Sequence, residues 1–163
     1  RNIRVFVSFQ ADEANGRFGD PMIDHFALID DFDIDALGLS SYPVFAFDHP
    51  TDVPDDYLDP FADATELPLI MVEGGWNSGD VPWAESTPQE QVAYFDRYEE
   101  LLDRIGAELW VGLTPTDLDI DAFDLPPDQA EGLANFALMG IWDVNLDRKP
   151  AFGAWKRIFD RPY

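Results

Sequence analysis

Short apolar segments alternate along the chain with longer segments of helical or loop character. Residues 3–10, 34–42, 67–73 and 109–114 are enriched in β-branched, aromatic and leucine side chains, which predicts one strand over each range. The third segment is apolar from residue 67 to residue 72, a pattern typical of a buried parallel strand.

Helical patterns lie between these strands, and the clearest covers residues 87–106. Thr87 and Glu90 form a capping box around Pro88, and Gly106 provides a natural end. The expected apolar face of this helix consists of Val92, Phe95, Leu101, Leu102 and Ile105.

Weaker helical patterns occupy three further segments. A helix over residues 20–32 would begin with Asp20 at the N-cap and Pro21 in the first turn. Residues 54–64 are expected to hold a short helix, and an acidic loop with another short helix is expected through residues 117–136. A last helix over residues 150–159 would have an inner face of Phe152, Trp155, Ile158 and Phe159.

The order of these elements predicts an α/β fold with a parallel sheet and right-handed crossovers. Four βα units make half of a (β/α)8 barrel, which needs roughly 250 residues. A doubly wound sheet is the rival architecture, but no Gly-rich phosphate loop follows any predicted strand. We therefore expect residues 1–163 to form a single domain, equivalent to half of a barrel.

The charge balance is strongly acidic and limits the classes of partner. The 33 acidic and 10 basic residues give a formal net charge of −23, which argues against nucleic acid and anionic membranes as partners. Because the acidic residues are spread along the whole chain, we favour a protein from a high-salt environment. An ordinary acidic secreted protein is the alternative, and the absence of cysteine does not fix the compartment.

The candidate chemistry lies at the end of the third predicted strand. Glu73 follows the apolar run, and Gly74, Gly75 and Trp76 follow Glu73. In an α/β barrel the active site is built at the carboxyl ends of the strands. The two glycines permit a sharp turn, and the Trp76 indole offers a flat surface on which a sugar can stack.

Three sequence blocks, at residues 39–43, 69–77 and 140–143, resemble the carboxyl-terminal half of a clan A glycoside hydrolase, together with residues 149–151 and Trp155. The chain is most similar to family 53, the arabinogalactan endo-β-1,4-galactanases and their relatives. The resemblance implies strands five to eight of a TIM barrel, a β-linked polysaccharide substrate and an extracellular location. It also implies that Glu73 is the nucleophile of a retaining reaction and that Tyr42 orients it. The alternative for Tyr42 is a packing corner formed with Pro43.

The acid/base partner is missing from this pattern. Clan A enzymes place a Glu at the end of strand four, usually after Asn, and this chain has no Asn-Glu pair. Asp12 and Glu13 match no family motif and are expected to be solvated loop acids. Two hypotheses follow: a glycosidase that is inactive without an N-terminal half, or a non-catalytic carbohydrate-binding or structural half-barrel. An N-terminal half-barrel or a second copy of the chain would cover the open sheet edges.

Further sugar contacts are predicted at the ends of the other strands. Gln10 ends the first strand and carries an amide donor, and Asp117 follows the fourth. Trp83 is a weaker candidate for a saccharide groove, and Trp110 is expected in the core because it begins a strand.

A metal site is not expected. Asp117, Asp119 and Asp121 have the spacing of the start of a calcium loop, but the sixth position is Ala122 and the twelfth is Asp128. The segment therefore fits an acidic surface loop better than a calcium site, and the proposed reaction requires no cofactor.

We expect the melting temperature of this protein to rise steeply as salt is added up to the molar range. The Debye length shortens from ~10 Å at 0.1 M to ~3 Å at 1 M salt, which weakens repulsion among the carboxylates. Thermal unfolding followed by circular dichroism at increasing NaCl concentration measures the effect. A melting temperature that does not respond to salt would contradict the high-salt interpretation.

Overall fold

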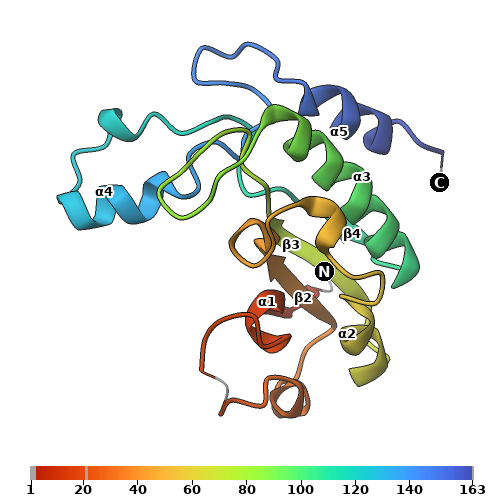
Figure 1. The fold of residues 1–163 in the computed structure, drawn as a ribbon. Helices are drawn as coiled ribbons and strands as arrows, with labels where there is room; N and C mark the ends of the chain where they lie inside the picture. Colours follow the sequence, from red (N-terminus) through yellow and green to blue (C-terminus); the bar gives the residue numbers. More distant parts are fainter. Residues whose placement is uncertain (1–2, 21, 163) are drawn as a thin grey trace.

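The computed structural model describes residues 3–20 and 22–162, which contain a four-stranded sheet (Figure 1). The strands are β1 (Phe6–Gln10), β2 (Ala36–Ser41), β3 (Leu69–Gly74) and β4 (Leu109–Trp110). All neighbouring pairs are parallel, and the strand order β1-β2-β3-β4 follows the chain. A doubly wound sheet has a point at which the strand order reverses, and this sheet has none in the described residues. The predicted α/β fold of barrel type is therefore confirmed.

In the described part of the chain, three helices lie in the crossovers between the strands and two more follow β4. They are α1 (Ala11–Ala14), α2 (Asp59–Ala64), α3 (Pro88–Arg104), α4 (Pro127–Ala134) and α5 (Ala151–Phe159), with 3-10 turns η1 (Phe26–Asp31), η2 (Pro43–Phe45), η3 (Pro50–Asp52) and η4 (Ile120–Ala122). The longest, α3, begins as its capping box predicts, because the Thr87 side chain accepts a hydrogen bond from the Glu90 backbone N–H. Helix α5 packs against α3, and α4 extends away from the sheet (Figure 1).

Most predicted elements are shorter in the structure, and two of them differ in a way that affects the fold. The helix expected over residues 20–32 is reduced to η1, and Pro21 lies outside the described residues. The Asp20 carboxylate caps a local turn by accepting from the Met22 backbone N–H at 2.9 Å. The fourth strand ends at Trp110, although Val111 and Leu113 still donate backbone hydrogen bonds to β3.

The core lies between one face of the sheet and α3. Leu37, Leu39 and Met71 have no exposed surface. Tyr98 is also fully buried on α3, and Leu101 is nearly so, so α3 presents a wider and more aromatic inner face than expected. On α5 the predicted inner residue Phe159 is instead 75% exposed, because Ala151 and Ala154 occupy the closest contact positions.

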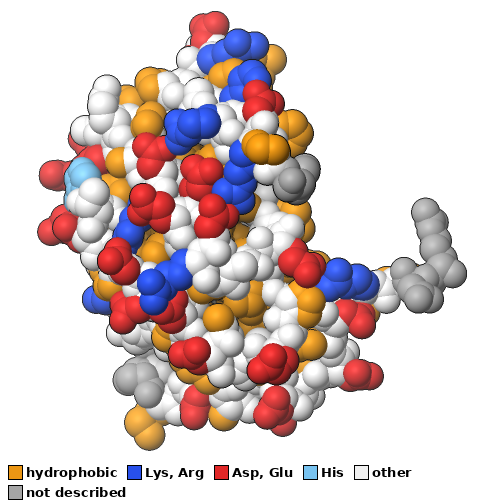
Figure 2. Space-filling view, turned by 90° about the vertical axis from the view of Figure 1, so that its right-hand side faces the viewer, with side chains coloured by type: hydrophobic (Ala, Val, Ile, Leu, Met, Phe, Trp, Pro, Cys, Tyr) orange, Lys and Arg blue, Asp and Glu red, His pale blue; other side chains and the backbone are white. Residues whose placement is uncertain are grey.

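The outer surface carries arginines paired with carboxylates from neighbouring elements, and Figure 2 shows such blue side chains among the red ones. Arg97 and Arg104 on α3 pair with Asp55 and Asp59, each at 2.6 Å. Each surface ion pair of this kind contributes little to the free energy of unfolding. Together these pairs offset only part of the repulsion among the surface carboxylates. Within the described ranges, no helix combines the length and apolarity needed to cross a membrane.

Gly140→Ala is expected to destabilise the fold, whereas the control Gly153→Ala is expected to stabilise it. A Cβ at residue 140 would lie 2.2 Å from the Thr116 carbonyl carbon and 2.3 Å from the Asp117 backbone nitrogen. Backbone must then move, at a cost of about 1–3 kcal/mol. A Cβ at Gly153 in α5 meets no described atom within 4 Å, and Ala favours a helix by roughly 1 kcal/mol over Gly. Chemical denaturation measures both, and equal unfolding free energies would contradict the packing.

Candidate active site

Glu73 lies at the carboxyl end of β3, next to β2. The pairing of these strands contains a bulge: Leu39 pairs with Met71, whereas Ser40 pairs with Glu73, so Val72 is the extra residue. Strict alternation would turn Glu73 to the same covered face as Leu69 and Met71. An extra residue reverses the alternation, and the Glu73 side chain is accordingly exposed. The bulge therefore delivers a carboxylate to the surface at the end of a largely buried strand.

Tyr42 brings a proton donor to this carboxylate. It follows β2, is only 6% exposed, and its phenol donates a hydrogen bond to Glu73 Oε1. Burial, and next the hydrogen bond and charge of Glu73, hold the pKa of Tyr42 far above its ordinary value of 10.0. Tyr42 therefore remains a protonated donor that faces Glu73. The structure brings together the two residues to which the sequence assigned the chemistry.

Asp12 lies buried behind Tyr42, and the expectation of a solvated loop acid is wrong for this residue. Its side chain has no exposed surface, and Oδ2 accepts from the Tyr42 backbone N–H at 2.6 Å. Oδ1 accepts from the Tyr57 hydroxyl at 2.6 Å, and Ser41 Oγ contacts both oxygens at 3.1 and 3.2 Å. Asp12 thus fixes the backbone of the residue that contacts Glu73.

The hydrogen bonds around Asp12 form a buried network. Ser41 Oγ lies 2.7 Å from the Tyr98 hydroxyl on α3, and Tyr57 comes from the loop before α2. Burial raises the pKa values of Tyr57 and Tyr98 well above the ordinary value, so both keep their protons. Burial also raises the pKa of Asp12, and the hydrogen bonds oppose this shift. No motif in the sequence marks this network.

Trp76 does not occupy the position expected of a sugar platform. Its side chain is 1% exposed, and the indole N–H donates to Ser86 Oγ at 2.8 Å. The turn before it runs against other backbone, since a Cβ on Gly74 would lie 2.5 Å from the Ser41 carbonyl oxygen. The prediction of a stacking role for Trp76 is therefore wrong: this tryptophan anchors the turn after Glu73.

Gln10 and Asp117 also have structural partners. Gln10 Oε1 accepts from the Asp12 backbone N–H at 2.9 Å and caps α1, so its carbonyl is engaged while its amide group stays a candidate donor. The buried Asp117 carboxylate forms an ion pair with Lys149 at 2.6 Å and accepts from the Gly140 N–H at 3.0 Å. Burial raises the pKa of Asp117 despite this pair. The assignment of Asp117 to substrate is wrong, because its carboxylate joins two chain segments.

The acidic segment after β4 does not form a metal cluster in the described part of the chain, where no group of three or more His, Cys, Asp or Glu side chains could hold an ion. The pairing of Asp117 with Lys149 removes the first residue of the calcium-like spacing. Asp119 instead precedes η4 without capping it by its side chain. The physical reason is that a neighbouring ammonium group competes with any cation for the same oxygen.

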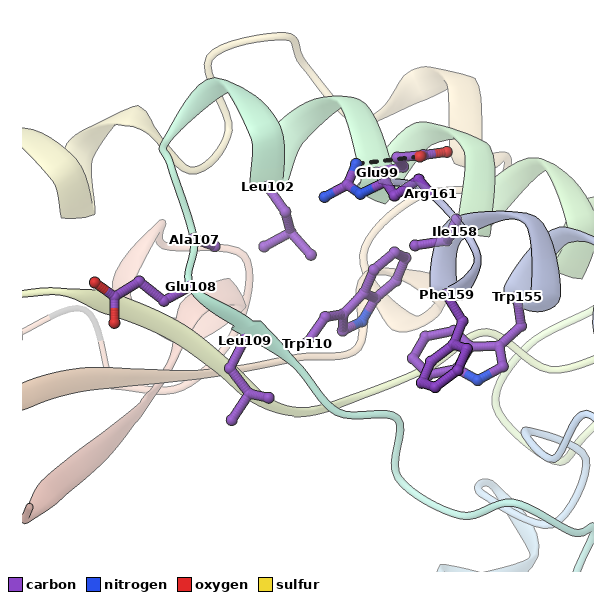
Figure 3. A pocket seen from close by; sticks show the side chains of 10 residues that line it. All are labelled: Glu99, Leu102, Ala107, Glu108, Leu109, Trp110, Trp155, Ile158, Phe159 and Arg161. Carbon is purple, nitrogen blue, oxygen red and sulfur yellow. Dashed lines mark hydrogen bonds and ion pairs between the residues drawn. The ribbon is translucent and has the colours of Figure 1, made fainter. Parts of the chain in front are cut away.

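Two of the cavities near the β4 side of the sheet are lined by tryptophans. One of about 190 Å³ borders Gly74, Gly75 and Trp142, beside the strand ends. Trp142 bridges to Thr116 in the continuation of β4, a placement that the sequence did not indicate. The other, of about 220 Å³, is formed by α3, β4 and α5, and Figure 3 shows Trp110 and Trp155 on its wall. It has no lining residue from β2 or β3, so it is not part of the candidate site.

Comparison with known proteins identifies the fold but no family. No family model and no curated protein match the chain. Among solved structures, a Ruminococcus gnavus β-glucuronidase in complex with D-glucaro 1,5-lactone has a TM-score of 0.60 at 13% identity, over 94% of this chain and 26% of that one. A Rhizomucor miehei β-1,3-glucanosyltransferase mutant has a TM-score of 0.52 at 16% identity, over 91% of this chain and 49% of that one.

A GH2 β-galacturonidase from Eisenbergiella tayi gives a similar result, with a TM-score of 0.57 at 16% identity over 80% of this chain and 25% of that one. The chain therefore spans between a quarter and a half of these TIM-barrel proteins. At such identities the likeness shows the fold alone, which is that of part of a TIM barrel. It does not single out family 53.

Asp12→Asn is expected to flatten the dependence of stability on pH. Because burial raises the pKa of Asp12 above 3.8, the folded state binds more protons than the unfolded state between the ordinary and the raised value. The contribution of Asp12 to stability is therefore greatest in acid and is lost as pH rises through that range. Asp63→Asn on α2 removes the same charge from an exposed position and serves as the control. Unfolding free energies measured against pH should have a shallower slope for Asp12→Asn, and parallel profiles of the two variants would contradict the assignment.

Proposed function

We propose that this chain is the carboxyl-terminal part of a retaining β-glycoside hydrolase in which Glu73 is the nucleophile. The observation that carries the proposal is the exposed Glu73 carboxylate, which accepts a hydrogen bond from the buried phenol of Tyr42. Its place at the carboxyl end of a parallel strand is where TIM barrels build their active sites. The barrel fold shared with glycosidases agrees with this assignment.

The two carboxylate oxygens of Glu73 have different roles in the proposed mechanism. Tyr42 donates to Oε1, which leaves Oε2 to attack the anomeric carbon. The bond from this carbon to the leaving oxygen breaks as the Glu73 ester forms, and a carboxylic acid about 5 Å away protonates the leaving oxygen. Water then gives a proton to that same carboxyl group, attacks the anomeric carbon and releases Glu73 as a carboxylate. Tyr42 orients Glu73 toward the sugar through its hydrogen bond to Oε1.

The substrate class follows from the resemblance and the neighbours. Family 53 similarity suggests β-1,4-galactan as the first polysaccharide to test. The solved neighbours bear the names of enzymes for other sugars, a β-1,3-glucanosyltransferase and a β-galacturonidase among them. The proposed substrate is therefore a β-linked oligosaccharide or polysaccharide. The proposed reaction needs no metal or organic cofactor and takes place in a high-salt, extracellular setting.

The acid/base residue would come from further βα units placed beside this sheet. Of the four described strands only β3 carries a carboxylate at its end, because Asp12 after β1 is buried and fully engaged. Phe6 and Leu109, on the two outer strands, are 48% and 49% exposed. We propose that an N-terminal half-barrel or a second copy of the chain covers these strands and supplies the acid.

The same observation favours a second candidate function. A sheet with one carboxylate at its strand ends can bind a sugar but lacks the pair that retaining hydrolysis requires. On this alternative the chain is a non-catalytic carbohydrate-binding half-barrel. The two candidates differ in one respect, which is whether Glu73 forms a covalent bond with a sugar.

Mechanism-based trapping tests Glu73 without needing the acid. A 2,4-dinitrophenyl leaving group departs as an anion and takes no proton, and fluorine at C2 of the sugar slows hydrolysis of the ester. We expect 2,4-dinitrophenyl 2-deoxy-2-fluoro-β-galactoside or the corresponding β-glucoside to add one fluorosugar to Glu73, detected by peptide mass spectrometry. Tyr42→Phe should form the same adduct at least tenfold more slowly, because the donor that orients the carboxylate is lost.

Glu73→Gln is the matched control, because it keeps the shape of the side chain and removes the nucleophile. This variant should fold like the wild type, judged by circular dichroism, and should acquire no label. A folded wild-type chain that stays unlabelled by both reagents, or that is labelled at another residue, would remove Glu73 from the mechanism. Sugar binding without a label would favour the non-catalytic candidate.

A further inference from the structure

We propose that Trp83 forms a second sugar subsite, which takes an uncharged hexose unit of the same β-linked chain and excludes uronates. This inference rests on the proposed function, because the subsite extends from the Tyr42–Glu73 pair. Trp83 is 64% exposed and lines a cleft of about 570 Å³, within the range of ligand pockets.

A series of contacts between aromatic rings connects Tyr42 to this cleft. The Tyr42 ring contacts Phe136 edge-to-face with centroids 5.1 Å apart, and Phe136 contacts Phe45 in the same way at 5.5 Å. Phe45 then meets Trp83 at 6.0 Å, again edge-to-face. These contacts link the buried donor of Glu73 to the exposed indole of Trp83 through two partly exposed rings, and exposed aromatic rings can bind successive sugars by stacking.

The loop that carries Trp83 is held in place before any ligand binds. The Trp83 backbone N–H donates to Oδ1 of the fully buried Asn135 at 2.9 Å. Val81 and Ala84 bond to each other through their backbones, and the Ser86 N–H donates to Asp80 at 3.0 Å. An exposed tryptophan on a fixed loop suits a binding platform, because little conformational entropy is lost when a sugar stacks on it.

The charges around the cleft select among sugars. Four carboxylates line it, from Asp48, Asp80, Glu85 and Glu90, and no lysine or arginine does. Asp80 and Glu90 already accept hydrogen bonds, from Ser86 and Thr87. Within the described chain Asp48 and Glu85 accept none, so they can receive the hydroxyl groups of a neutral hexose. A uronate would bring a like charge to the same place and would be repelled.

Calorimetric titration of the chain tests the subsite with oligosaccharides of equal length. The probes are β-1,4-galactohexaose, β-1,3-glucohexaose and hexagalacturonate, at the lowest salt concentration at which the protein stays folded. We expect at least one neutral hexaose to bind and hexagalacturonate to bind at least tenfold more weakly. Trp83→Ala should weaken the neutral hexaose about tenfold, because one stacked sugar is lost.

Phe159→Ala is the matched control, since Phe159 is an exposed aromatic residue on the separate cavity between α3 and α5. It should leave the affinity unchanged. Affinity that falls with Phe159→Ala instead of Trp83→Ala would place the sugar in the other cavity and overturn the proposal. The proposal also fails if hexagalacturonate binds as well as the neutral probes, or if neither neutral hexaose binds.

The binding experiment and the trapping experiment separate the two proposals. Repeating the titration with Glu73→Gln keeps the subsite and prevents any turnover. If binding depends on Trp83 but the chain traps no fluorosugar, the subsite proposal stands and the role of Glu73 as nucleophile is rejected. If Glu73 is labelled but Trp83→Ala binds the sugar with unchanged affinity, Glu73 stands as the nucleophile and the subsite proposal is rejected.

Discussion

A buried carboxylate organises the candidate site, and the other features depend on it. Asp12 accepts hydrogen bonds from the Tyr42 backbone N–H and from two hydroxyl groups. The Tyr42 hydroxyl in turn donates a hydrogen bond to Glu73. An unpaired charge in this position would be costly, so each donor must stay where it is. The position of the Tyr42 ring is therefore set from behind, by groups that no substrate touches. This arrangement gives the exposed Glu73 carboxylate a fixed hydrogen-bond partner.

A second set of contacts fixes the turn that follows Glu73. Gln91 on α3 has no exposed surface and donates through Nε2 to the backbone carbonyls of Trp76, Leu138 and Gly140. The Trp76 indole is bound at the same time to Ser86. Together with the bulge at Val72, these contacts determine the direction in which Glu73 leaves the strand. Sites on rigid elements hold their geometry without help from a ligand.

The sequence predicted the features that depend on local chemistry. Thr87, Glu90 and Pro88 marked the start of α3, and the apolar run before Glu73 marked β3, because capping and strand burial are encoded within a few residues. It failed where distant partners decide. Trp76 and Asp117 are residue types that often bind sugars, but their partners Ser86 and Lys149, which lie outside the local motif, make them structural. Asp12 was missed for the same reason, since its three donors, Ser41, Tyr42 and Tyr57, come from two other segments of the chain.

The second face of the sheet bears on the proposal that further βα units complete the site. In a strand with one face toward water, apolar residues alternate with polar ones. In β3 the residues that alternate with the buried Leu69 and Met71 are also apolar: they are Ile70 and Val72, which are only half-buried in this chain. A parallel strand that is apolar on both sides is built for cover on both sides, as in a closed barrel. The same cover would bring other strand ends toward Glu73, so closing the apolar face and supplying the missing acid are one structural requirement.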